Sequence, residues 1–151
     1  MKWVTRKNAL IDRIASAWLI KRFIDPQAEL LFVPVEQLLA TAEREGATAY
    51  HAKGAPLGGT DTLTSFEQLA AHHNLTSDPA MVLMASIVHD ADHFADSGVE
   101  PEAGGMRAMA LGFGHTYGER DHEKIDAALP AYDAVFAWCK LQVAQGREPL
   151  H

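Results

Sequence analysis

Residues 11–26 read IDRIASAWLIKRFIDP, and this stretch decides the fold of the 151-residue chain. Its apolar residues recur at helical spacing, which predicts a helix over Ile11–Ile24. Asp25-Pro26 ends that helix, because the residue before a proline avoids the helical backbone conformation. Short strands are predicted on both sides, over Lys2–Thr5 and over residues 30–34, a continuous apolar run. A strand, a helix and a second strand therefore open the chain.

Helices dominate the remainder of the sequence. A helix is predicted over Val35–Glu45, where Gly46 stops it, and a third short strand over Thr48–His51. The later helices are predicted from Thr64 or Ser65 to His73, from Asp78-Pro79 past Ala91, from Pro101 to Tyr117, and from Asp121 to Ala144, with Pro130 expected to kink or divide the last. The expected fold class is α+β: a helix-dominated single domain over residues 1–151 with a small N-terminal sheet.

Composition and charge exclude several classes of protein. The formal charge is −7, from 13 Lys and Arg against 20 Asp and Glu, which argues against nucleic-acid binding. The single Cys139 excludes an internal disulfide and a cysteine-based zinc cluster. The N-terminus is too polar for a signal peptide, and no run approaches the ~18 apolar residues that a membrane span needs. The sequence therefore predicts a cytoplasmic protein with no nucleic-acid or membrane partner.

The segment His89-Asp90-Ala91-Asp92-His93 is the strongest candidate for chemistry. On a helix, positions i, i+3 and i+4 share one side, so His89, Asp92 and His93 are predicted to point the same way. Two imidazoles and a carboxylate suit a divalent metal ion such as Zn, Mn, Fe or Ni, with positions left for water or substrate. Asp90 is expected to face elsewhere. The alternative is a solvated helix face near a helix C-terminus, where imidazolium is favoured.

A local excess of basic residues marks the N-terminal part of this acidic chain. Such a surface attracts a small anion, and Arg13 or Arg22 is predicted to hold it. Asp12 is a second candidate for substrate binding, although an aspartate in a first helical turn more simply complements the helix dipole or caps the helix. Basic side chains that merely solvate a helix face are the alternative. The basic residues are Lys2, Arg6, Lys7, Arg13, Lys21 and Arg22.

Glu67 and His51 lie on either side of a loop rich in glycine and threonine, residues 52–64. Glu67 is predicted at the start of a helix, where it can act as a general base or a metal ligand. A glutamate at that position is also typical of a capping box. His51 ends a strand at the mouth of the loop and is a further candidate for substrate binding.

Five blocks of the sequence resemble the C-terminal domain of ChrB-type chromate-resistance proteins. The resemblance covers nearly the whole chain and implies a role in chromate resistance, as a sensor or resistance factor. Asp12-Arg13, Glu67 and His89-x-x-Asp92 all fall in shared blocks, which implies that these groups meet at one site. The blocks are residues 3–6 with 11–26, 29–34, 65–67, 87–92 and 132–138.

The sequence also departs from this family. Members commonly carry a histidine and a cysteine ahead of the segment that corresponds to Ser65-Phe66-Glu67, whereas here residues 58–64 read GGTDTLT. The missing thiol weakens the case for thiol-based reduction of chromate. His51 or His93 can replace the missing imidazole.

Two functions are predicted from these observations. The first is a metal-binding domain of the chromate-resistance type, which binds or senses a metal or a small oxyanion. The second is a metal-dependent hydrolase, lyase or isomerase acting on a small anionic substrate, in which Glu67 or His51 moves protons and Arg13 or Arg22 holds the substrate. An interaction module without metal is a third reading. The aromatic residues of the last predicted helix suit either the core or the face of a homodimer.

Overall fold

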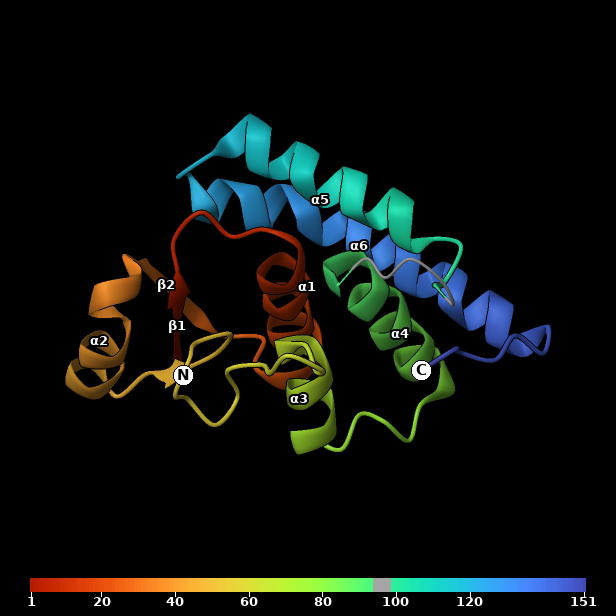
Figure 1. Cartoon of the computed structure of the whole chain (residues 1–151), viewed down its shortest axis with the longest axis horizontal. Coiled ribbons are helices and arrows are strands. Elements are labelled where there is room, and N and C mark those ends of the chain that lie inside the picture. Colours follow the sequence, from red (N-terminus) through yellow and green to blue (C-terminus); the bar gives the residue numbers. More distant parts are fainter. Residues whose placement is uncertain (94–98) are drawn as a thin grey trace.

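A computed structural model describes residues 1–93 and 99–151, and its elements confirm the predicted α+β class (Figure 1). The chain opens as strand, helix, strand, and helices make up most of the rest. In order the elements are β1 (Lys2–Arg6), α1 (Ile11–Leu19), the π-helical turn η1 (Ile20–Ile24), β2 (Glu29–Val33), the 3-10 turn η2 (Val35–Gln37), α2 (Leu38–Glu45), β3 (Thr48–Ala49), α3 (Ser65–His72), α4 (Pro79–His93), α5 (Ala103–Tyr117) and α6 (Asp121–Ala144).

The strands form a parallel sheet, in the order β2-β1-β3 among the described residues. Side chains of β1 alternate between its two faces. Trp3 joins the main core beside α1, whereas Val4 packs with Leu38 of α2 on the opposite side. The sheet therefore lies between α2 and the helical part of the molecule (Figure 1).

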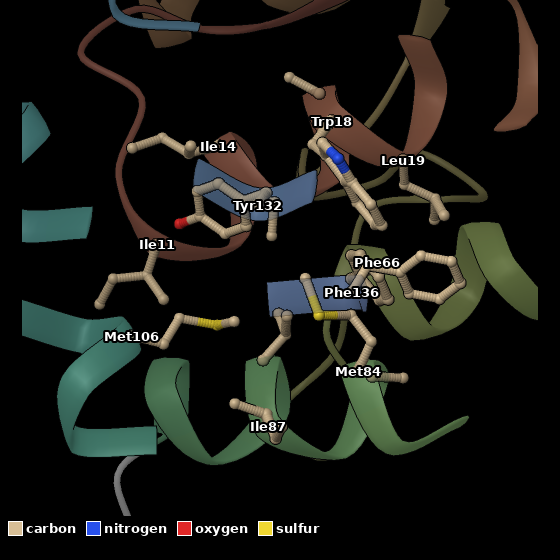
Figure 2. Close-up of a cluster of buried hydrophobic side chains, with 14 of the residues drawn as sticks. Ile11, Ile14, Trp18, Leu19, Phe66, Met84, Ile87, Met106, Tyr132 and Phe136 are labelled. Carbon is tan, nitrogen blue, oxygen red and sulfur yellow. The ribbon is translucent and has the colours of Figure 1, made fainter. Parts of the chain in front are cut away.

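α1 is the central helix, in contact with α3, α4, α5 and α6. Every residue from Ile11 to Leu19 is buried. Figure 2 shows Ile14 and Trp18 of α1 facing the side chains of α4 and α6. Because α1 is enclosed on all sides, its polar residues must find partners inside the protein. Asp12 and Arg13 are two such buried polar residues of α1.

Several boundaries differ from the sequence predictions. The helix predicted over Ile11–Ile24 is α-helical only to Leu19, and η1 completes it. Of the two effects expected of Pro130, a kink or a division, division of the last helix is wrong, since α6 is continuous through it. Pro130 and Asp126, whose carbonyl loses its helical hydrogen bond, are both exposed, so water can satisfy that carbonyl. Buried Ala128 and Tyr132 hold the helix to the core on either side.

Among the described residues, no helix is long and apolar enough to cross a membrane. Tyr132 and Phe136, which suited either the core or a dimer face, are buried in the core of the chain. The homodimer itself stays a prediction.

Candidate functional site

Asp12 joins α1 to the start of α3. Its carboxylate accepts hydrogen bonds from the backbone N–H groups of Ser65 (2.8 Å) and Phe66 (3.1 Å). It also contacts His51 Nδ1 at 2.6 Å and accepts a hydrogen bond from Ser16 Oγ at 3.1 Å. Asp12 lies in the first turn of α1, as predicted, but the N–H groups that it satisfies belong to α3.

These contacts favour the ionised form of Asp12. Burial opposes ionisation, but the hydrogen bond and charge of His51 and the two α3 N–H groups outweigh it, so the pKa of Asp12 is lowered. His51 adopts a left-handed backbone conformation, with φ of 46°, that is uncommon for a residue with a side chain. Such strain is often found at functional sites. Asp12 and His51 are thus a preformed carboxylate–imidazole pair.

The pair lines a cavity of about 280 Å³, which we call the Arg13 cleft. An adjoining cavity of about 530 Å³ extends along the loop of residues 52–64 and shares Arg6, His51 and Asp92 with it. The charged and polar side chains that line the cleft are Arg6, Asp12, Arg13, His51, Asp92 and Arg107. Arginines outnumber carboxylates among them, so the cleft is basic although the chain is acidic.

Arg13 is the least accessible cation of the cleft, with only 5% of its surface exposed. Its Nη2 donates to the Asn8 carbonyl at 2.8 Å, whereas its Nε has no hydrogen-bond partner among the described residues. The buried hydroxyl of Tyr50 likewise has no partner there. Burial and the nearby charge of Arg6 lower the pKa of Arg13. A buried guanidinium with an unused N–H attracts an anionic acceptor.

Asp92 also lines this cleft, and its Oδ2 lies 3.8 Å from His93 Nδ1. Burial and the charge of Asp12 raise its pKa, while His51, His93 and Arg13 oppose the rise. The backbone carbonyl of the preceding Ala91 accepts a hydrogen bond from Arg107 at 2.9 Å. The C-terminal turn of α4 is thereby tied to α5 at the cleft.

Glu67 is both a cap and a partner of histidine. It forms a capping box with Thr64, in which Glu67 Oε1 accepts from the Thr64 N–H at 2.9 Å and the Thr64 hydroxyl accepts from the Glu67 N–H at 3.1 Å. The same Oε1 lies 2.7 Å from His89 Nδ1. The predicted capping box is confirmed, and it fixes one imidazole of α4.

The three predicted metal ligands lie next to one another at the end of α4. His93 stacks on His89 with ring centroids 4.5 Å apart, and its Nδ1 lies 3.8 Å from Asp92 Oδ2, while Asp92 also lines the Arg13 cleft. Asp90, expected to face elsewhere, is buried and lies 2.7 Å from His151 Nε2. No local spacing could reveal His151, because it lies 61 positions from Asp90.

Arg22 stands apart from the other predicted residues. It donates to Asp133 of α6 through Nε (3.0 Å) and Nη2 (2.8 Å), and Trp18 Nε1 donates to the same carboxylate at 2.8 Å. Its hydrogen bonds therefore join η1 to α6, whereas Asp12, Arg13, His51 and Asp92 meet at the cleft.

The residues of the cleft lie in the part of the chain that is similar to a known protein family. A family model described as "ChrB, C-terminal domain" matches residues 3–139. The chain belongs to the ChrB C-terminal domain family. This confirms the resemblance drawn from the sequence and associates the chain with chromate resistance. The match includes the Arg13 cleft, Glu67 and His89, but not His151.

A curated relative supports the same assignment. Protein ChrB of Cupriavidus metallidurans is 33% identical over 114 residues, which make up 74% of this chain and 32% of that protein. The chain thus spans about a third of the length of this ChrB relative. No solved structure matches the chain.

Proposed function

We propose that this ChrB C-terminal domain binds a small oxyanion of the chromate class in the Arg13 cleft. The observation that carries the proposal is the buried guanidinium of Arg13, a residue that lines a basic cavity and whose Nε has no hydrogen-bond partner in the part of the chain that the structure describes. Arginine presents N–H groups in a rigid planar fork that suits oxygens of a tetrahedral anion.

The charge balance of the cleft supports an anion. Asp12 is compensated by His51 and by two backbone N–H groups, so little of its negative charge acts on the cavity. Of the remaining charged lining, the cations Arg6 and Arg13 face the carboxylate of Asp92. A cleft of one dominant sign also raises the local concentration of a ligand of opposite sign.

Chromate binding by wild type and Arg13→Gln tests the proposal. Loss of a charge-assisted hydrogen bond predicts binding about 10- to 100-fold weaker in the variant, measured by isothermal titration calorimetry. Arg120→Gln, at an exposed arginine paired with Glu123, is the matched control and should bind as wild type does. Sulfate and molybdate as competitors define the anion class.

A second variant guards against misfolding of the first. Arg6 is exposed, so Arg6→Gln should keep the wild-type thermal midpoint while it weakens chromate binding and reduces its salt dependence. Equal affinity in wild type and both variants, or no chromate binding by wild type, would refute the proposal.

The Asp12–His51 pair favours one other candidate, a metal-dependent hydrolase, lyase or isomerase for a small anionic substrate. A carboxylate 2.6 Å from Nδ1 orients the ring and leaves Nε2 for proton transfer. In that function Arg13 would hold the substrate and Glu67 would act through His89. Turnover of a small carboxylic acid that is lost in His51→Gln would favour this candidate over simple binding.

A further inference from the structure

We propose that His89, Asp90 and His151 form a binding site for a divalent transition-metal ion of the zinc class. One ligand atom of each residue lies within 4.8 Å of the other two. The site joins α4 to residues 145–151 and is distinct from the Arg13 cleft, whose lining includes none of the three residues. It does not depend on the oxyanion function proposed above.

The donor set matches the chemistry of such an ion. Two imidazole nitrogens and one carboxylate oxygen give zinc three protein ligands, with a fourth position left for water or another ligand. Ring centroids of His89 and His151 are 4.6 Å apart, and His151 Nε2 lies 2.7 Å from Asp90 Oδ1. Ligands about 2 Å from a tetrahedral zinc ion lie about 3.3 Å from one another. Asp90 Oδ1 and His151 Nε2 must therefore move slightly apart, whereas donors near the 4.8 Å limit must move closer.

Outer contacts already orient two of the ligands. Glu67 holds Nδ1 of His89 at 2.7 Å, which leaves Nε2 for the metal. Asp90, whose side chain is only 1% exposed, accepts the Glu100 N–H through Oδ2 at 2.7 Å, which leaves Oδ1 facing His151. Carboxylate–histidine–metal arrangements of this kind fix the ring and raise its basicity.

A buried network brings His151 to the site. The backbone N–H of Leu150 donates to Glu100 Oε2 at 2.9 Å, and that of His151 donates to Ser86 Oγ at 3.2 Å. Arg147 donates to Glu100 Oε1 at 2.8 Å. Ser86 and Glu100 are themselves buried and hydrogen-bonded to each other. Residues 147–151 are therefore held against α4 by contacts that do not involve the imidazole of His151.

The alternative to a metal site is a plain ion pair between Asp90 and protonated His151. An ion pair needs neither a second imidazole nor the Glu67 contact that orients it. The presence of His89 in the same cluster favours a cation.

Zinc titration of untagged, chelator-treated protein tests the proposal. Wild type should bind one Zn²⁺ per chain, and His151→Ala should weaken binding at least 100-fold. His151 lies outside every helix and strand, but its removal leaves Asp90 Oδ1 without the imidazole, so the variant should stay folded with a thermal midpoint a few degrees lower in the absence of metal. His115→Ala, at an exposed histidine of α5, is the matched control and should bind as wild type does. Glu67→Gln should weaken binding about 10- to 100-fold without changing the stoichiometry.

Two results would overturn the proposal. One is the absence of stoichiometric zinc in wild type, which would leave an Asp90–His151 ion pair. The other is unchanged zinc binding in His151→Ala together with loss in Asp92→Asn or His93→Ala, which would assign the metal to His89, Asp92 and His93 instead. Chromate binding by wild type and His151→Ala is measured in parallel, so failure of this site is distinguishable from failure of the cleft.

Discussion

Asp92 is a residue of the cleft whose ionised carboxylate opposes both folding and anion binding. Its pKa is raised by burial and by the charge of Asp12, so its ionised form costs folding free energy. Asp92→Asn should therefore raise the free energy of unfolding at neutral pH by up to about 1 kcal/mol. The same change removes a negative charge from the Arg13 cleft and should tighten chromate binding.

Urea denaturation at pH 7, with chromate titration alongside, measures both effects. Asp126→Asn, at an exposed residue of α6, should change neither quantity. A less stable Asp92→Asn protein with weaker chromate binding would mean that the carboxylate supports the cleft instead of opposing its charge.

At the scale of elements, the N-terminus of α3 is held from two directions. Thr64 caps it locally, and Asp12 caps its first N–H groups from α1. Thr64→Ala removes the local cap and should lower the free energy of unfolding by about 1 kcal/mol. Because Glu67 shares the capping box, the change should also loosen the ring of His89 and weaken zinc binding.

Thermal or urea unfolding and zinc titration of Thr64→Ala provide the measurement. Thr76→Ala, at an exposed residue ahead of α4, is the control. Stability lost with unchanged zinc affinity would separate the cap from the proposed metal site.

The two caps of α3 also show what a sequence can reveal. The capping box of Thr64 and Glu67 lies within one helical turn, so local spacing predicted it. The contact of Asp12 with Ser65 spans 53 positions, and only the burial of α1 on all sides explains it. For the same reason the sequence predicted Asp12, Arg13 and His51 as candidates without showing that they line one cavity. Pro130 does not divide α6, because packing of the helix on both sides of it outweighs one lost hydrogen bond.

At the scale of the whole molecule, buried carboxylates set the response to acid. The pKa of Asp12 is lowered as described above. Burial opposes the ionisation of Glu100, but hydrogen bonds from Ser86, the Leu150 N–H and Arg147 outweigh the effect of burial. The pKa of Glu100 is therefore lowered too. A carboxyl group with a lowered folded-state pKa binds protons more readily when unfolded. Its contribution to stability is therefore complete above the pKa of the group in the unfolded chain, about 4, and is lost as pH falls through the pKa of the group in the folded protein.

The free energy of unfolding should accordingly be flat near neutral pH and fall below about pH 4. Glu100→Gln cannot ionise at this position, so its stability should be lower at neutral pH and should fall less steeply in acid. Urea denaturation of both proteins between pH 7 and pH 2 gives the two slopes, with Glu119→Gln, at an exposed residue paired with Lys7, as the control. Parallel slopes of unfolding free energy against pH for wild type and Glu100→Gln would contradict this account. They would mean that the charge of Glu100 does not help to hold residues 147–151 against α4.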